Sequence, residues 1–81
     1  MIDQTDNKIS PRPQPYDIKE VMASNSQAIY RLCYRLTGNV EDAKDLTQEV
    51  FIRAYKGLEG FKGQSEIRTW LYRIAINLGS S

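Results

Sequence analysis

Apolar residues recur along this chain at the spacing of an amphipathic helix. From Asn39 to Leu58, at about 100° per residue, apolar side chains fall on one stripe and polar side chains lie opposite. The stripe consists of Ala43, Leu46, Val50 and Ala54, widened by Phe51 and Leu58. This pattern predicts a helix that packs the stripe into a core.

A second helix is predicted before this one. The helical spacing of its apolar residues begins near Tyr16 and continues unchanged through the polar run at residues 24–26, where the helix can bend. Gly38 is expected to end it as a C′ glycine, and Asn39 to start the next helix. The apolar positions in phase are Ile18, Met22, Ile29, Leu32, Cys33 and Leu36.

A third helix is predicted near the end of the chain. Three glycines between residues 57 and 63 keep the preceding connection irregular. Ser65 is the expected N-cap of a helix from Glu66 to about Leu78. Its buried stripe is expected to be Ile67, Leu71, Ile74 and Leu78.

These segments predict an all-α fold, a compact bundle of three to four helices formed by residues 16–78. Residues 1–15 are polar and contain three prolines, so we expect a flexible tail outside the core. With 81 residues the chain is one small domain, near the size at which a hydrophobic core is only just sufficient.

Charge and cysteine content narrow the classes of function. Eleven Lys and Arg against ten Asp and Glu give a net charge of +1, so the chain is not a polycation that coats duplex DNA. The single Cys33 excludes an internal disulfide, and we expect it buried, in a reducing cytoplasm. Without histidine no usual zinc spacing can form, and no apolar run reaches the roughly 20 residues that span a bilayer. We therefore expect no metal, no cofactor and no membrane insertion.

The polar face of the central helix carries a compact acidic cluster. Asp45, Gln48 and Glu49 lie together at helical spacing, and Ile52 projects into the same face one turn later. One interpretation is a solvated face with a stray isoleucine. The other is a docking patch for a partner that presents arginines to the carboxylates and a pocket to Ile52. Spacing alone leaves both open.

The last predicted helix carries a tryptophan, a guanidinium and an amide along one flank. Trp70, Arg73 and Asn77 supply stacking, phosphate attraction and base-edge hydrogen bonding, which single-strand recognition requires. Taken singly, they can also be a core residue, a solvated cation and a helix cap. The preceding loop adds Phe61, expected to be exposed at the loop tip where a base could stack. The predicted DNA-binding set is Phe61, Lys62, Gly63, Arg68, Trp70, Arg73 and Asn77.

The run from about Ala28 to Asn77 resembles region 2 of bacterial sigma factors, specifically the extracytoplasmic-function (ECF) group. The matching segments begin at Tyr30 (YRL), Glu41 (EDAKDLTQEVFIRAY), Phe61 (FKG) and Thr69 (TWLYRIA). The resemblance implies a non-catalytic specificity subunit of RNA polymerase.

In that family the helix matching Asp45, Gln48 and Glu49 docks on the coiled coil of the β′ clamp. The resemblance further implies that the loop around Phe61 and the helix carrying Asn77 bind the non-template strand of the −10 promoter element and hold a flipped-out base. Trp70 stands where primary sigma factors have the first tryptophan of a melting wedge. Leu71 replaces the second, which puts strong intrinsic melting in doubt. Because members continue into a −35-binding domain, residues 79–81 are expected to be a linker or a cloning scar.

Three other functions compete with this one. A helix-turn-helix reader of duplex DNA joins its helices by roughly three or four residues, and the connection between Lys56 and Ser65 is longer. A module that binds only proteins stays open, since anti-sigma factors mask these same faces in the family. An enzyme is disfavoured, because Asp45 and Glu49 are paired carboxylates without a nucleophile nearby.

Overall fold

The computed structural model describes residues 16–61, 63 and 65–80. In this part of the chain α2 (Ile18–Thr37), α3 (Val40–Gly57) and α4 (Ile67–Gly79) follow one another, with a short 3-10 helix, η1 (Leu58–Gly60), after α3. Each pair of the three α-helices is in contact, so the predicted all-α bundle is confirmed. The tail predicted for residues 1–15 lies outside the described residues.

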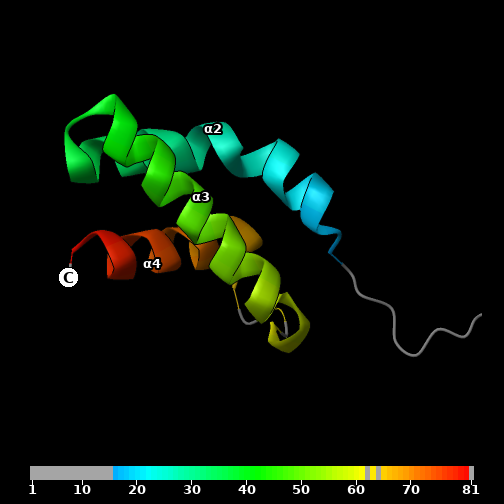
Figure 1. The fold of residues 1–81 in the computed structure, drawn as a ribbon. Helices are drawn as coiled ribbons and strands as arrows, with labels where there is room; N and C mark the ends of the chain where they lie inside the picture. The colour runs from blue at the N-terminus through cyan, green and yellow to red at the C-terminus, as the bar shows by residue number, and fades with distance from the viewer. Residues whose placement is uncertain (1–15, 62, 64, 81) are drawn as a thin grey trace, which may run out of the picture.

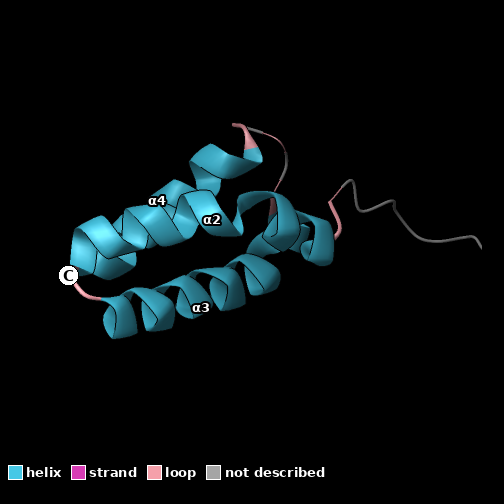
Figure 2. Ribbon diagram, turned by 90° about the horizontal axis from the view of Figure 1, so that it is seen from above, coloured by secondary structure: helices cyan, strands magenta, loops and turns pink. Residues whose placement is uncertain are grey.

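The helices form a three-sided bundle. Along the chain α2 and α3 run in opposite directions as a hairpin, and α4 returns in the direction of α2 (Figure 1). Figure 2 shows α3 on the other side of the bundle from α2 and α4. The end of α4 thereby reaches the turn between α2 and α3.

Local signals set both ends of α2, and the end at Gly38 is the one that the sequence predicts. Asp17 is the N-cap, and its Oδ1 accepts a hydrogen bond from the Lys19 backbone N–H at 3.2 Å. At the other end Gly38 has a φ of 83°, and its N–H donates to the Tyr34 carbonyl at 2.7 Å. A left-handed residue there satisfies a carbonyl of the last turn, which is why glycine is favoured. The helix runs without a break through residues 24–26.

Asn39 begins α3 as predicted. Its Oδ1 accepts from the Asp42 backbone N–H at 2.8 Å, and its Nδ2 donates to the Asp42 carboxylate at 2.9 Å. The first of these bonds satisfies a backbone N–H that the first turn leaves without a helical partner, the second joins the two side chains, and the acidic first turn suits the helix dipole. The apolar stripe predicted for α3 faces the core, where Ala43, Val50 and Ala54 are fully buried.

The core lies where the three helices meet. Ile29 and Cys33 of α2, Val50 of α3 and Leu71 of α4 are inaccessible to solvent. Burial raises the pKa of the Cys33 thiol, and a hydrogen bond with Thr47 opposes that rise. Cys33 is therefore a buried small side chain, as the sequence predicts.

The predicted N-cap of α4 is wrong. The N-cap is Glu66 and not Ser65, and it makes no side-chain capping hydrogen bond, so the helix begins at Ile67. The helix ends at Gly79, one residue beyond the predicted end near Leu78. A Cβ at Gly79 would lie 2.9 Å from Leu36 Cδ1 and 3.2 Å from Leu46 Cδ2. The missing side chain is what lets the end of α4 approach the α2–α3 hairpin so closely.

None of the helices in the described residues is both long enough and apolar enough to cross a membrane.

Candidate functional site

The exposed side of α4 presents two of the predicted DNA-binding side chains together. Arg73 and Asn77 are both exposed and, four residues apart, lie on one face of the helix. Exposed Thr69 and Ile76 complete this surface, which we call the α4 outer face. Within the described residues neither the Arg73 guanidinium nor the Asn77 amide has a hydrogen-bonding partner, so Asn77 does not cap the helix. Its donor and acceptor are free for a ligand.

Trp70 lies at the edge of that face and packs inward. It is partly buried against the core, and a Cβ at Gly57 would lie 3.3 Å from its Cζ2 atom. The indole therefore covers the end of α3 and is only partly exposed. Leu71, at the position of the second wedge tryptophan, is fully buried and cannot contact DNA from this arrangement.

The expectation that Phe61 is exposed at the loop tip is wrong. Its side chain is 9% exposed, with its ring centroid 4.7 Å from that of Trp70 and 5.4 Å from that of Tyr16. The cause is η1, which turns the chain inward and lets the Phe61 N–H donate to the Leu58 carbonyl at 3.1 Å. Phe61 thus joins the segment just before α2 to the start of α4.

The remaining loop residues are only partly described. Gly63 has a φ of 78°, a conformation that favours glycine, and is exposed. Lys62, predicted to bind DNA, lies outside the described residues.

Arg68 makes contacts that the sequence did not predict. Its Nε donates to Asn25 Oδ1 at 2.7 Å and its Nη2 to the Ser24 carbonyl at 2.8 Å, joining α4 to α2. Asn25 is 4% exposed, and its Nδ2 donates to the Val21 carbonyl at 2.8 Å. A buried amide needs such partners, because an unsatisfied polar group in a core is costly. The sequence offered one signal for this contact: Asn25 is a polar residue at a position where the helical spacing of α2 predicts a buried side chain.

The acidic cluster of α3 lies on the surface, as predicted. Asp45 and Gln48 are exposed, and Ile52 is 47% exposed. Glu49 pairs with Arg53 through a 3.3 Å contact between Oε2 and Nε, one turn along the helix. A surface pair of this kind contributes little to stability, so a partner's arginine could replace it. We call Asp45, Gln48, Glu49 and Ile52 the acidic patch.

An apolar groove runs beside the acidic patch, between α2 and α3. Gln48 and Ile52 belong to both, and Met22, Ile52 and Tyr55 are 43%, 47% and 66% exposed. Three large apolar side chains are thus exposed along one seam, an arrangement that is found at many protein interaction surfaces. Sequence reasoning treated Met22 as core and missed this groove. Its lining residues are Ile18, Met22, Ser26, Thr47, Gln48, Phe51, Ile52 and Tyr55.

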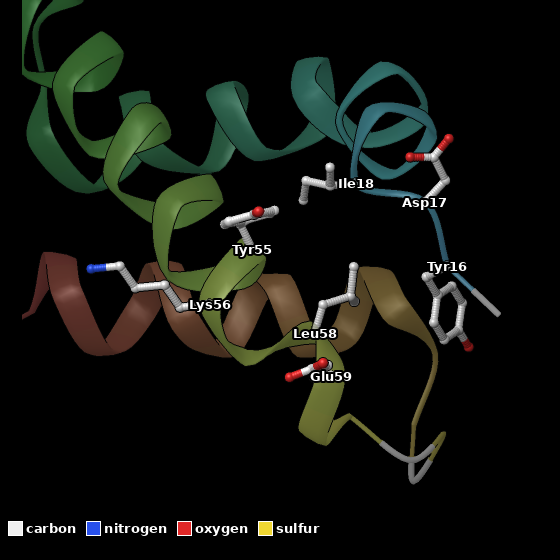
Figure 3. A pocket seen from close by; sticks show the side chains of 7 residues that line it. All are labelled: Tyr16, Asp17, Ile18, Tyr55, Lys56, Leu58 and Glu59. Carbon is white, nitrogen blue, oxygen red and sulfur yellow. The ribbon is translucent and has the colours of Figure 1, made fainter. Parts of the chain in front are cut away.

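A second hollow continues this seam toward the start of α2. Ile18 and Tyr55 line both hollows, and Figure 3 shows Leu58 pointing toward Ile18 while Lys56 points away. Asp17 and Glu59 add carboxylates at its edge. The hollow therefore continues the apolar groove, and its own lining is more polar.

Residues 16–61, 63 and 65–80 contain no group of three metal-ligating side chains that could hold an ion.

Comparison with known proteins identifies the family. Residues 21–79 match the family model Sigma-70 region 2. The chain is 60% identical over 45 residues, 56% of its length, to the ECF RNA polymerase sigma factor SigG of Mycobacterium tuberculosis (strain CDC 1551 / Oshkosh). It is 56% identical over 50 residues, 62% of its length, to the ECF RNA polymerase sigma factor SigW of Bacillus subtilis (strain 168). It is also 40% identical over 75 residues, 90% of its length, to the ECF RNA polymerase sigma-E factor of Haemophilus influenzae.

These matches cover only part of the relatives, namely 12%, 27% and 40% of their lengths. The chain belongs to the Sigma-70 region 2 family, and within it to region 2 of the ECF sigma factors. It is therefore an RNA polymerase sigma factor domain, of a family whose members are transcription initiation factors and not enzymes.

Proposed function

We propose that this chain is the promoter-specificity domain of an ECF sigma factor. It docks on the β′ clamp coiled coil of RNA polymerase through the acidic patch, and it binds the non-template strand of the −10 element through the α4 outer face. It acts in the cytoplasm, where the polymerase and the promoter are.

The observation that carries the proposal is the side-by-side exposure of Arg73 and Asn77 on α4. A guanidinium attracts phosphate, and an amide with a free donor and acceptor can read the edge of an unpaired base. The aromatic group of Phe61, Trp70 and Tyr16, in which Phe61 is buried and the other two rings are partly buried, supports the loop beside them. A base that stacks here has to use the partly exposed rings of this group, because the Phe61 ring is covered.

Clamp docking is supported by the chemistry of the acidic patch. Carboxylates suit a partner rich in arginine, and Ile52 with the apolar groove offers the central apolar contact that protein interfaces use. An exposed apolar seam also suits an anti-sigma factor, which is the second candidate: a module that binds proteins only.

The two candidates differ in single-strand binding. We expect the chain to bind a −10-type single-stranded oligonucleotide in fluorescence anisotropy, with single-base substitutions changing the affinity. Asn77→Ala should change which base is preferred, because the amide reads base edges. Arg73→Ala on the same face is the matched control, and it should weaken all sequences alike, since phosphate carries no base identity.

An equal weakening for every sequence in Asn77→Ala would make the amide a backbone contact and contradict base reading. No saturable binding by the unmodified chain would favour the module that binds only proteins. Phe61→Ala is unsuitable for the base test alone, because removal of a buried ring also lowers stability.

A further inference from the structure

Arg68 lies in the first turn of α4, at a helix start that has no side-chain cap. The helix begins at Ile67, and its N-cap, Glu66, makes no side-chain hydrogen bond to the turn. The first turn is joined instead to a distant segment, because Arg68 Nε donates to Asn25 Oδ1 and Nη2 donates to the Ser24 carbonyl. These two bonds tie the start of α4 to α2.

The Arg68 guanidinium occupies a place that a free side chain would leave. It lines a groove between α2 and α4 together with Arg31 and Arg35 of α2, and no carboxylate is among the described residues of that groove. Like charges that share a groove repel one another, and an exposed arginine is otherwise free to turn to water. The two hydrogen bonds therefore keep it there, and the buried Asn25 amide depends on this donor.

The two bonds also fix the rotation of α4 about its own axis. Leu71 and Ala75 pack the helix into the core, but apolar contacts have no preferred direction, whereas hydrogen bonds weaken steeply when they are misaligned. At about 100° per residue, Asn77 lies on the side of the helix opposite Arg68, and Arg73 lies about 140° from Arg68. Holding Arg68 against α2 thus turns Asn77 and Arg73 away from α2, onto the α4 outer face.

We propose that Arg68 is a positioning residue for base reading. It holds α4 at the rotation in which the Asn77 amide meets the base edge, and it does not itself contact the DNA strand. A recognition site has to be held to within about 0.5 Å and 10–20° of its productive geometry, and hydrogen bonds from a neighbouring element supply such support. This inference rests on the base reading by Asn77 in the proposed function.

The test measures base preference and salt dependence together, by fluorescence anisotropy with −10-type oligonucleotides that carry single-base substitutions. Arg68→Met keeps an aliphatic stem and removes both donors. We expect the ratio of affinities for the preferred base and the other bases to fall by roughly 2- to 10-fold, the effect of one misaligned hydrogen bond. The slope of log K against log salt concentration should stay unchanged, because no phosphate contact is lost.

Arg68→Lys separates the positioning role from a phosphate contact. Lysine keeps the positive charge but lacks the planar fork of donors that reaches two acceptors. A positioning residue loses base preference in this variant, whereas a phosphate contact keeps its affinity for every strand. For a phosphate contact, Arg68→Met would instead make the salt slope shallower by about 0.7 for all strands alike.

Two controls show how the effect reaches the base. In the background of Asn77→Ala, which lacks the amide, Arg68→Met should cause no further loss of base preference. Asn39→Ala removes two side-chain hydrogen bonds in the first turn of α3, and so it lowers stability without removing a bond to α4. It should leave base preference unchanged. Circular dichroism shows that each variant is folded at the temperature of the binding measurements.

Trp70 reports on the placement of α4 without DNA. It is the single tryptophan of the chain, it is partly buried, and it lies two residues after Arg68. A change in the rotation of α4 changes the exposure of the indole. The emission maximum of Trp70 should therefore shift in both Arg68 variants and stay unchanged in Asn39→Ala.

The outcomes separate the positioning role from the proposed function. Unchanged base preference or unshifted Trp70 emission in both Arg68 variants overturns the positioning role, as does a shallower salt slope in Arg68→Met. An equal loss of preference in Asn39→Ala also overturns it, because the effect would then follow from stability alone. If Asn77→Ala alters no base preference, the proposed base reading itself fails, and the positioning role fails with it even where the Trp70 emission shifts.

Discussion

At the scale of single residues, the contact between Asn25 and Arg68 shows how a polar side chain is accommodated in a small core. Asn25 occupies a buried position of α2 that an apolar side chain would ordinarily fill. Its amide donates to its own helix and accepts from a helix 43 residues away along the chain. The hydrogen bond therefore specifies how α2 and α4 pack, in addition to the apolar contacts.

This pairing predicts unequal costs for its two members. Arg68→Ala leaves the buried Asn25 Oδ1 without a donor, which should cost about 1–3 kcal/mol in the free energy of unfolding. Asn25→Ala should lower the free energy of unfolding less through a lost hydrogen bond, because the exposed Arg68 guanidinium can hydrogen-bond to water instead. Urea denaturation followed by circular dichroism measures both. The costs should not add in the double variant, since both changes remove one interaction, and strictly additive costs would contradict the coupling.

Phe61 is a second residue whose surroundings depend on a distant part of the chain. Glycines nearby suggested an exposed loop tip, whereas the ring lies against Trp70 and Tyr16. Nothing in the local sequence states that Tyr16, far away in the chain, comes to lie beside this loop.

At the scale of elements, the helix ends follow from short-range chemistry. Gly38 adopts a left-handed conformation, and an added Cβ there would meet no other atom within 4 Å. Any effect of substitution must therefore come from the backbone conformation and not from a steric clash. This makes Gly38 a clean test of what ends α2.

Gly38→Ala should lower the free energy of unfolding by about 1–2 kcal/mol, the cost of placing an L-residue in the left-handed region. Gly60→Ala is the control, because Gly60 also has open space for a Cβ but no positive φ. It should be neutral, or should stabilise by roughly 0.4–1 kcal/mol through the unfolded chain. Thermal and urea denaturation of the two variants measure the difference. Equal effects would show that backbone strain at Gly38 is not what ends the helix.

At the scale of the whole molecule, the candidate surfaces lie on different helices. The acidic patch and the apolar groove use α3 and its seam with α2, whereas the proposed DNA-binding face is on α4. Separate surfaces allow a polymerase and a DNA strand to bind this domain together.

Substitutions in one surface should therefore leave the other unaffected. We expect Gln48→Ala and Ile52→Ala each to weaken binding to the isolated β′ clamp coiled coil by on the order of 1–2 kcal/mol, as central interface positions do. Their affinity for the −10-type oligonucleotide should be unchanged, and Asn77→Ala should leave clamp binding unchanged. Isothermal titration calorimetry against the clamp fragment measures the first effect. Full clamp affinity in both α3 variants would remove the docking role.

The sequence by itself determined the parts of this protein that depend on neighbours within a turn or two. Helix phase, the Asn39 cap, the Gly38 terminus and the burial of Cys33 all follow from spacing and residue type. The exposed positions of Asp45, Gln48, Arg73 and Asn77 follow from the same phase, because a stripe that faces the core leaves the opposite side in water. Their roles toward polymerase and DNA stay predictions.

Only the tertiary structure decided what depends on segments distant in the chain. Four features each require two segments of the chain to come together. They are the burial of Phe61, the hydrogen bond of Arg68 to Asn25, the contact of Gly79 with Leu36 and the gathering of three arginines in one groove. Periodicity tells which side of a helix is apolar, but it does not tell which residue of another helix will lie against it. That choice is made by the packing of the whole bundle, in which side-chain volumes and buried hydrogen bonds must be satisfied at the same time.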